Sequence, residues 1–267
     1  MSAFKKFKFH RKNKLEDFDP AATPFLEDEA SGKALLEEHA DELDRLQNLL
    51  HAEGRRKLLL VLQGMDTSGK DGCIRWVFSR TSPLGVRVTP FKAPTEDERA
   101  RDFLWRCHAV VPRSGEIMIW NRSHYEDLLV PVVAGSLAKA EIRERQQQIN
   151  DFERLLTETG TVVLKCMLHI GKEEQRQRLQ ARIDDPEKRW KFRLGDLDVR
   201  KQWDAYQDAY EKLMQATSTP IAPWWVVPAD DKLHRNLVVA GLVIRTLKSM
   251  DLKPAPNAEG VEKIIVQ

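Results

Sequence analysis

The sequence has 267 residues, of which 42% are hydrophobic and 31% are charged, a composition typical of a globular protein rather than a disordered one. Lys and Arg number 43 against 41 Asp and Glu, and a formal net charge of +2 argues against a protein whose whole surface binds nucleic acid. No apolar run reaches the roughly 18 residues of a membrane span, and the basic N-terminus lacks the apolar core of a secretion signal. The sequence therefore predicts a cytoplasmic protein with no membrane partner.

Regular elements are expected in a clear order along the chain. The first predicted helix covers 31–53, because apolar residues recur there at three- and four-residue steps and Gly54 follows. Continuous apolar runs predict buried strands at 57–63, 85–91, 116–121, 161–170 and 224–227. Helical periodicity predicts helices at 95–108, 138–158, 172–184, 202–216 and 232–250. Alternating strands and helices predict the α/β class, with a parallel five-stranded sheet covered by helices on both faces.

The residues directly after the first predicted strand match the pattern G-x-x-x-x-G-K. Glycines in this pattern let backbone N–H groups face a phosphate, the following helix presents its positive end, and Lys70 adds a full charge. The pattern alone arises by chance in roughly one chain of this length in ten, but here an apolar strand precedes it and an amphipathic helix follows. We therefore expect a phosphate-binding loop rather than a structural turn. The predicted phosphate contacts are Gly64, Thr67, Ser68, Gly69, Lys70 and Asp71.

This loop departs from its usual form at the residue after the lysine. Asp71 stands where a Ser or Thr would normally hold magnesium. Asp66 inside the loop is the nearest carboxylate, and hard oxygen ligands suit Mg²⁺. We predict Asp66 as a ligand of Mg²⁺, with Mn²⁺ able to replace it. A simpler interpretation, in which Asp66 only caps the loop, stays open.

Polar residues follow the second and third predicted strands. The third is followed by NRSHYED (121–127), and the carboxyl ends of parallel strands meet at the edge of a sheet where ligands bind. Arg122 there suits a transferring phosphoryl group, because a planar guanidinium binds it better than a point charge. A surface turn with ordinary ion pairs is the alternative for Arg122, Glu126 and Asp127. After the second strand, Thr95 and Glu98 have the spacing of a helix capping box, which is a sufficient structural explanation for both residues. It does not exclude a role of this loop in holding an acceptor of the phosphoryl group.

A basic segment occupies 176–193. Arg178 and Arg182 stand four residues apart and so share a helix face, and further cations with interleaved aromatic residues follow at 188–193. A mobile lid that brings these cations over bound phosphates is one interpretation. A solvated helix face and a site for single-stranded nucleic acid are the others, although acidic residues on both sides argue against nucleic acid.

Four separated segments together resemble polyphosphate kinase family 2, and the similarity runs from 32 to 250 in one order. The segments are GMDTSGKDG (64–72), FKAPTEDE (91–98), WNRSHYEDLLV (120–130) and RWKFRLGDLDVRKQWDAY (189–206). The resemblance implies a three-layer P-loop kinase fold with a helical lid, related to thymidylate kinase. It also implies Mg²⁺-dependent transfer of a terminal phosphoryl group between inorganic polyphosphate and a nucleotide. The NRSHYED version is similar to the subgroup that accepts both AMP and ADP, with GMP and GDP as further candidates.

The same resemblance implies roles for individual residues. Catalytic residues would be Asp66, Lys70 and Arg122. Lid cations would line the polyphosphate path, namely Arg178, Arg182, Lys188, Arg189, Lys191 and Arg193. The nucleotide would contact Phe91, Lys92, Pro94, Thr95, Glu98, Asn121, Arg122 and Glu126. Many family members carry Asp where this chain has Asn121, which argues against a magnesium site built from two carboxylates here.

The chain is interpreted as one domain over 1–267, because no Pro- or Gly-rich linker divides it. Within it we distinguish a basic N-terminal extension (1–31), a lid segment (184–205) and a C-terminal tail (251–267). The family implies a homodimer or a homotetramer, and no nucleic-acid partner. Two other functions stay open at this point: an ATP-dependent nucleoside monophosphate kinase of the same fold, and a non-catalytic regulator that binds nucleotides or nucleic acid.

Overall fold

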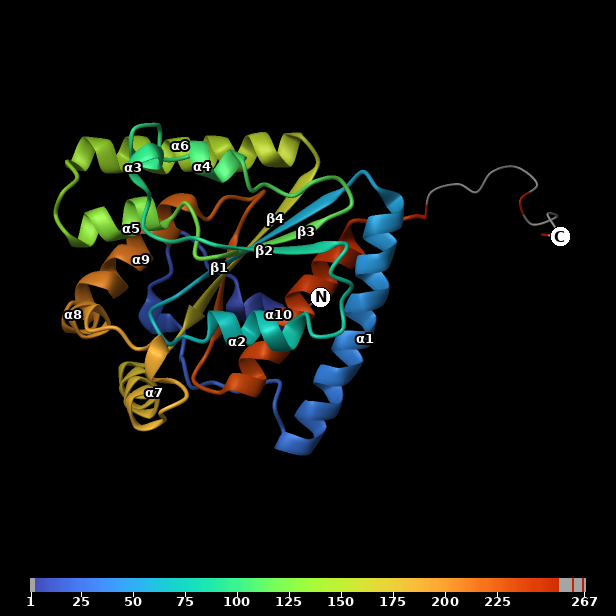
Figure 1. Ribbon diagram of the computed structural model, residues 1–267, viewed down its shortest axis with the longest axis horizontal. Helices are drawn as coiled ribbons and strands as arrows, with labels where there is room; N and C mark the ends of the chain where they lie inside the picture. The colour runs from blue at the N-terminus through green and yellow to red at the C-terminus, as the bar shows by residue number, and fades with distance from the viewer. Residues whose placement is uncertain (1–2, 255–260, 262–265, 267) are drawn as a thin grey trace.

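A five-stranded parallel sheet forms the centre of the computed structural model, which describes residues 3–254 together with residues 261 and 266 (Figure 1). The strand order is β2-β3-β1-β4-β5. The strands are β1 (Lys57–Gln63), β2 (Val86–Pro90), β3 (Ile117–Asn121), β4 (Thr161–His169) and β5 (Trp224–Pro228). The expected α/β class with five parallel strands is confirmed.

Helices cover both faces of this sheet (Figure 1). One face carries α1 (Glu29–Glu53), α2 (Lys70–Val77) and α10 (Lys232–Ser249). The opposite face carries α4 (Trp105–His108), α5 (Glu126–Val133), α6 (Lys139–Glu158) and α9 (Trp203–Thr217). The remaining helices are α3 (Glu96–Arg99), α7 (Lys172–Asp184) and α8 (Gly195–Lys201).

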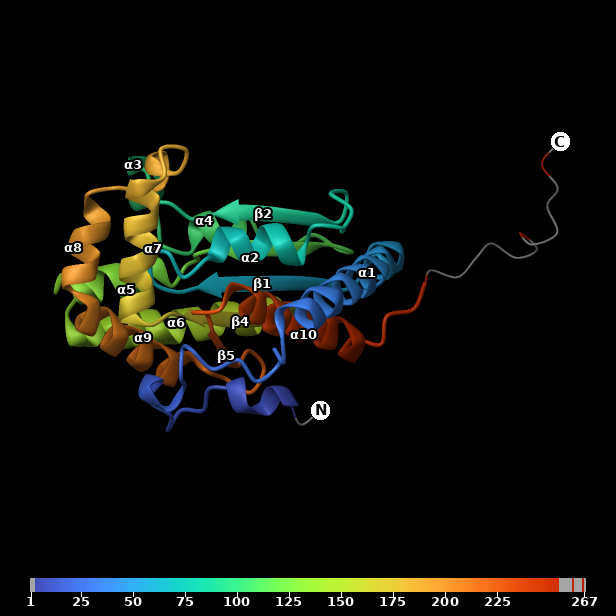
Figure 2. The same ribbon diagram turned by 90° about the horizontal axis from the view of Figure 1, so that it is seen from below.

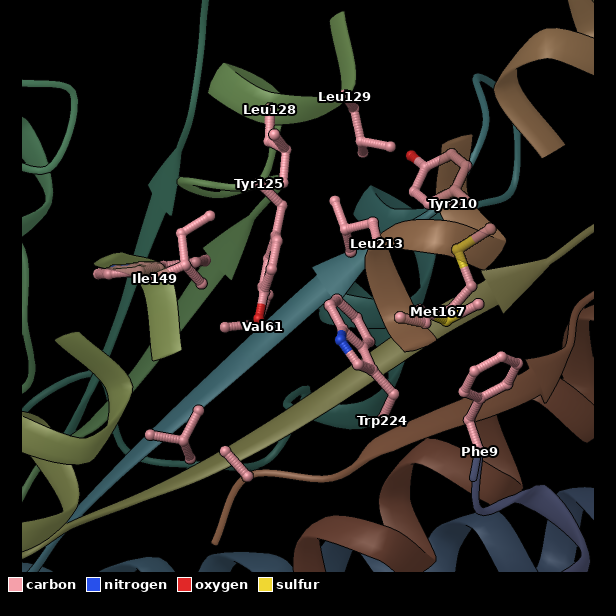
Figure 3. Close-up of a cluster of buried hydrophobic side chains, with 14 of the residues drawn as sticks. Phe9, Val61, Tyr125, Leu128, Leu129, Ile149, Met167, Tyr210, Leu213 and Trp224 are labelled. Carbon is pink, nitrogen blue, oxygen red and sulfur yellow. The ribbon is translucent and has the colours of Figure 1, made fainter. Parts of the chain in front are cut away.

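The central strand β1 is apolar on both faces, and this fixes its place between the two helical layers. Successive side chains of a strand point to opposite faces. Leu58, Leu60 and Leu62 pack in the cluster formed with α1, α2 and α10. Leu59 and Val61 pack in the opposite cluster, part of which Figure 3 shows around Val61. The loop that leaves β1 is therefore anchored by a strand buried from both sides.

The carboxyl ends of the strands all lie at one end of the molecule. Figure 2 shows the arrowheads of β1 and β2 directed toward the end where α7 and α8 lie. Loops after β1, β3 and β4 therefore meet there, as parallel strands require.

The helix expected over 95–108 is wrong, because two short helices, α3 and α4, occupy this range. Thr95 and Glu98 do form the capping box at the start of α3, with backbone-to-side-chain distances of 2.7 and 3.2 Å. The side chain of Asp102 accepts a hydrogen bond from the N–H of Leu104 at 3.0 Å, in a turn that separates the two helices. The first helix also begins earlier than expected, since Asp28 caps it by accepting from the N–H of Ser31 at 2.9 Å.

The segment interpreted as an N-terminal extension packs on the edge strand β5. It includes two short 3₁₀ helices, η1 (Ala3–Phe7) and η2 (Leu15–Asp17). The N–H of Phe9 donates to the carbonyl oxygen of Trp224 at 2.9 Å, and Phe9 joins the cluster shown in Figure 3. Residues 1–2 of this segment lie outside the described residues, as do 255–260, 262–265 and 267 of the predicted C-terminal tail. Within the described part of the chain, no helix combines the length and apolar character needed to cross a membrane.

Candidate active site

The phosphate-binding loop (64–70) joins β1 to α2, and its conformation depends on its glycines. Gly64 and Gly69 have φ angles of +147° and +94°, in the region that favours glycine. A Cβ at Gly64 would also lie 2.6 Å from the carbonyl oxygen of Leu168. The ammonium of Lys70 folds back over the loop and donates to the carbonyl oxygens of Gly64 at 2.6 Å and Met65 at 3.2 Å.

Lys70 is buried among other charges at the centre of the site. Burial lowers the pKa of its ammonium to about 8, and the nearby charge of Arg122 adds to this effect. The carboxylates of Asp66 and Glu126 act in the opposite direction. Lys70 therefore still carries its charge at pH 7, as a phosphate-binding lysine requires.

Arg122 follows β3 and faces the phosphate-binding loop. Its N–H donates to the carbonyl oxygen of Leu62 at 3.0 Å, which joins the ends of β3 and β1. Its Nη2 donates to Asp66 Oδ1 at 2.5 Å, and its Nη1 lies 3.6 Å from Glu126 Oε2. Burial opposes the charged form, but the carboxylates of Glu126 and Asp66 raise the pKa of Arg122. The structure thus brings the three predicted catalytic residues, Asp66, Lys70 and Arg122, to one edge of the sheet.

Glu126 lies at the start of α5, deep in the same site. Burial raises the pKa of its carboxyl group, while the charges of Arg122 and Lys70 act against this shift. The side-chain amide of Gln63, at the end of β1, lies 3.0 Å from Glu126 Oε1 and 3.0 Å from Ser123 Oγ. With its nitrogen toward Glu126, this amide donates to the carboxylate and accepts from Ser123. Glu126 is therefore held in place by the ends of two strands.

Asn121 and Asp71 form a hydrogen-bonded pair beside the phosphate-binding loop. Asn121 Nδ2 donates to Asp71 Oδ1 at 2.6 Å, so the end of β3 is tied to the first turn of α2. Their expected contacts with nucleotide and phosphate stay predictions.

The oxygen atoms around Asp66 suit a hydrated divalent cation. The buried hydroxyls of Thr67 and Ser68 have no hydrogen-bond partner within the described residues. Asp196 of α8, within the predicted lid segment, lies near Asp66, and burial together with the negative charge of Asp66 raises the pKa of its carboxyl group. No group of three metal-ligating side chains is present among residues 3–254, 261 and 266. The side-chain oxygens of Asp66, Thr67, Ser68 and Asp196 would instead suit a divalent cation that takes one or two carboxylates and keeps several waters.

Arg178 of α7 lies against the outside of the phosphate-binding loop. Its Nη1 donates to the carbonyl oxygen of Thr67 at 3.0 Å, and its Nε donates to Glu174 at 2.7 Å. Its Nη2 donates to the carbonyl oxygens of Ala229 and Asp230 at 2.8 and 2.6 Å. Arg178 therefore clamps the loop to α7 and to the segment after β5, and its expected contact with polyphosphate stays a prediction.

The other predicted lid cations lie at the end of α7 and in the segment that links it to α8, namely Arg182, Lys188, Arg189, Lys191 and Arg193. Arg182 Nη1 lies 3.8 Å from Asp196 Oδ2, which ties the end of α7 to the start of α8. Arg189 Nε donates to the carbonyl oxygen of Ile183 at 2.8 Å. Trp190 between these cations is 76% exposed. No residue of 189–191 or of α8 is buried, and segments with few buried apolar contacts have low local stability. The lid itself stays a prediction.

A cavity of about 510 Å³ lies beside the loop that follows β2. Pro94 and Glu98, for which the family resemblance implies nucleotide binding, line one side of it. Residues between 99 and 106, and residues of α5 and α6 such as Asp127 and Arg145, line the rest. The structure thus places part of the predicted nucleotide-binding segment at a cavity that also borders α5 and α6.

Other residues of that segment have structural contacts. Phe91 is buried, and its ring centroid lies 5.0 Å from that of Trp120, so its ring anchors the loop to the core. Lys92 is exposed, and its carbonyl oxygen accepts from Arg106 Nη1 at 2.9 Å. Arg106 Nη2 also donates to Asp127 at 2.6 Å. Sequence reasoning missed Arg106 because no motif marks it and its partners are distant in the chain.

Residues 26–255 of the chain match the family model described as Polyphosphate kinase 2 (PPK2). The AMP/ADP-polyphosphate phosphotransferase of Meiothermus ruber is 49% identical over 256 residues, which cover 95% of each chain. The ADP-polyphosphate phosphotransferase of Rhodopseudomonas palustris is 39% identical, over 91% of this chain and 89% of the relative. The crystal structure of polyphosphate kinase 2 from Arthrobacter aurescens TC1 matches with a TM-score of 0.92 at 44% identity, over 96% of this chain and 92% of that one.

Proposed function

The chain belongs to the polyphosphate kinase 2 family, and we propose that it transfers the terminal phosphoryl group between inorganic polyphosphate and AMP or ADP. It is a phosphotransferase with a P-loop kinase fold. The observation that supports the proposal best is the convergence of Lys70, Arg122 and Asp66 at the carboxyl ends of β1 and β3. GMP and GDP are further acceptors within the proposal.

The chemistry needs charge compensation more than proton transfer. A terminal phosphate oxygen of the acceptor nucleotide is already an anion at neutral pH, so it needs little help from a general base. It attacks the terminal phosphorus of polyphosphate in line, and the bond to the bridging oxygen breaks. Lys70 and Arg122 offset the negative charge on the transferring group. The lid cations shield the polyanion and exclude water when the lid closes.

A divalent cation, Mg²⁺ with Mn²⁺ as a replacement, belongs to this proposal. Asp66 would hold it, with the hydroxyls of Thr67 and Ser68 and the carboxylate of Asp196 close by. When bound, the ion would neutralise part of the charge on the phosphate oxygens.

The test is to incubate the protein with ADP and polyphosphate in the absence of ATP. ATP formed in proportion to the polyphosphate consumed supports the proposal, and ADP alone is the control for an adenylate kinase activity. Separate incubations of AMP with polyphosphate and of AMP with ATP show which compound donates the phosphoryl group. Phosphorylation of AMP by ATP but not by polyphosphate would point to an ATP-dependent nucleoside monophosphate kinase. Tight oligonucleotide binding without any transfer would point to a regulator.

The assembly and location stay predictions within this proposal. A homodimer or homotetramer is inferred from the family resemblance, and light scattering on the purified protein measures it directly. A cytoplasmic location rests on the sequence composition alone.

A further inference from the structure

The first turn of α10 places a buried arginine directly behind the phosphate-binding loop. Arg235 is 2% exposed, and its Nη1 lies 3.3 Å from the carbonyl oxygen of Ser68, to which it donates. Its Nε and Nη2 donate to Asn236 Oδ1 at 3.2 and 2.9 Å. A Cβ at Gly69 would lie 1.9 Å from Arg235 Nη1, so the guanidinium rests against the glycine itself. Gly69 is thus required both by its φ angle and by this arginine.

The charge of Arg235 has only neutral hydrogen-bond partners in the described part of the chain. The thiol of Cys73 beside it is neutral as well, because burial raises its pKa to about 11. Burial lowers the pKa of Arg235 and the charge of Arg178 adds to this effect, while Cys73 and Asp231 act in the other direction. A buried charge without a close counter-ion destabilises a fold. An anion in the loop would offset that cost.

Arg235 also fixes the orientation of one peptide group of the loop. In a trans peptide the C=O and N–H groups point to opposite sides, and the structure describes no cis peptide. Since the carbonyl of Ser68 points to Arg235, the N–H of Gly69 points away from α10. Arg178 fixes the orientation of the preceding peptide group in the same way, because it donates to the carbonyl oxygen of Thr67. Two arginines from different helices therefore hold consecutive carbonyls from outside the loop.

We propose that Arg235 is a positioning residue of the phosphate site, which strengthens binding of the terminal phosphates of the polyphosphate donor. It acts through the peptide between Ser68 and Gly69 and through its own buried charge, and it does not touch the donor. The inference deepens the proposed function and rests on it, because it takes the polyphosphate end to be the group bound in the loop.

The test compares Arg235→Met with Arg235→Lys and Arg235→Gln. Calorimetry with inorganic tripolyphosphate measures binding without any turnover, and steady-state kinetics give KM for polyphosphate and for AMP separately. Arg245→Met is the matched control, since Arg245 lies on the same helix with its guanidinium carbon 5.2 Å from the Trp225 ring and away from the loop. Thermal unfolding without phosphate reports the stability of each variant.

We expect Arg235→Met to bind tripolyphosphate at least tenfold more weakly and to raise KM for polyphosphate to a similar extent, with KM for AMP changed less than twofold. Arg235→Lys should recover most of the affinity because it keeps the charge, and Arg235→Gln should recover less. The control should bind like the unmodified protein. A merely structural role predicts instead a lower unfolding temperature with unchanged affinity in the folded protein, and that result overturns the inference.

The outcomes also separate this inference from the proposed function. If the unmodified protein binds tripolyphosphate and Arg235→Met binds it equally well, the inference fails while the proposed function stands. If the unmodified protein does not bind tripolyphosphate, both fail. If Arg235→Met does not fold, the affinities of Arg235→Gln and Arg235→Lys for tripolyphosphate are compared instead. Equal affinities of these two variants would contradict a role for the charge.

Discussion

Arg122 and Asp66 form an ion pair, with Nη2 2.5 Å from Oδ1, that joins the end of β3 to the phosphate-binding loop after β1. Each group neutralises the other in this arrangement. A transferring phosphoryl group would compete for the guanidinium, and a divalent cation would compete for the carboxylate. The pair therefore keeps two charged groups in position at the point where both substrates and metal are expected to meet.

Removing the charge of Asp66 should change the dependence on metal. We expect Asp66→Asn to raise the Mg²⁺ concentration needed for half-maximal activity at least tenfold, because the amide is a poorer ligand for a hard cation. Titration of activity with Mg²⁺ at saturating polyphosphate measures this shift. Asp204→Asn is the matched control, since the Asp204 side chain is 91% exposed on α9. An unchanged Mg²⁺ dependence in Asp66→Asn would assign Asp66 to loop capping instead.

The activity should fall at alkaline pH because Lys70 loses its proton. Burial lowers the pKa of Lys70 to about 8, so the free enzyme keeps the ammonium below pH 8 and loses it as the pH rises. We expect kcat/KM for polyphosphate to decline through about pH 8. In Lys70→Arg, whose guanidinium stays protonated, the decline should move to higher pH.

Two further variants anchor this pH profile. Lys70→Ala should lower kcat/KM by about 10²–10³-fold across the profile without a change in the fold. Lys33→Ala, at an exposed position of α1, should leave the profile unchanged. A decline at the same pH in Lys70→Arg would assign the titration to another group.

The strands and the phosphate-binding loop could be predicted because their signals are local. The run KLLLVLQ (57–63) is apolar on both faces, and the G-x-x-x-x-G-K pattern follows it directly. The break between α3 and α4 could not, because the helical periodicity continues through a turn that depends on one side chain, Asp102. Charge and spacing alone do not distinguish a helix end from a helix interior.

The contacts around the loop depend on packing between distant segments. Sequence reasoning grouped Arg178 with the lid cations, whereas its guanidinium reaches Thr67, 111 residues earlier in the chain. Asp196 was missed because it is one of several acids in a mixed-charge segment, and only the position of α8 brings it near Asp66. Arg235 carries no motif at all, and its burial against Gly69 follows from the packing of α10 on α2 (Figure 1).

Replacing Asn121 by Asp should destabilise the protein through repulsion from Asp71. Asn121 Nδ2 donates to Asp71 Oδ1 at 2.6 Å, so Asn121→Asp would place two carboxylates in contact. We expect the midpoint of thermal unfolding at pH 7.5 to fall by about 2–4 °C. Repulsion between the two carboxylates would raise the pKa of one of them in the folded state. The folded protein would then bind an extra proton as the pH falls toward 5, so the loss of thermal stability would become smaller.

A second substitution tests whether the pair is the cause. Combining Asn121→Asp with Asp71→Asn restores one carboxylate and one amide, and should return the midpoint to near its original value. A loss of stability that persists in the double variant, or that does not depend on pH, would show that like-charge repulsion is not responsible.

Removing one partner of the buried ion pair between Lys165 and Glu153 should destabilise the helical layer that carries part of the site. Lys165 Nζ lies 2.7 Å from Glu153 Oε2, and the two side chains are 0% and 1% exposed. Lys165 also donates to Tyr125 Oη at 2.9 Å and to the carbonyl oxygen of Thr217 at 2.8 Å. Lys165→Met leaves the Glu153 carboxylate buried without its cation, so we expect a loss of about 3–5 kcal/mol in the free energy of unfolding.

The matched variant removes both charges. Lys165→Met combined with Glu153→Leu should recover much of the lost stability, because a buried ion pair is often replaced by apolar side chains at little net cost. Burial favours protonation of Glu153, and it is the charge of Lys165 that chiefly opposes it and keeps the pKa of Glu153 low. In Lys165→Met that pKa should rise, so the single variant should regain stability as the pH falls. Urea unfolding at pH 5.5 and 7.5 measures both effects. If the double variant loses as much free energy of unfolding as the two single variants together, this prediction is contradicted.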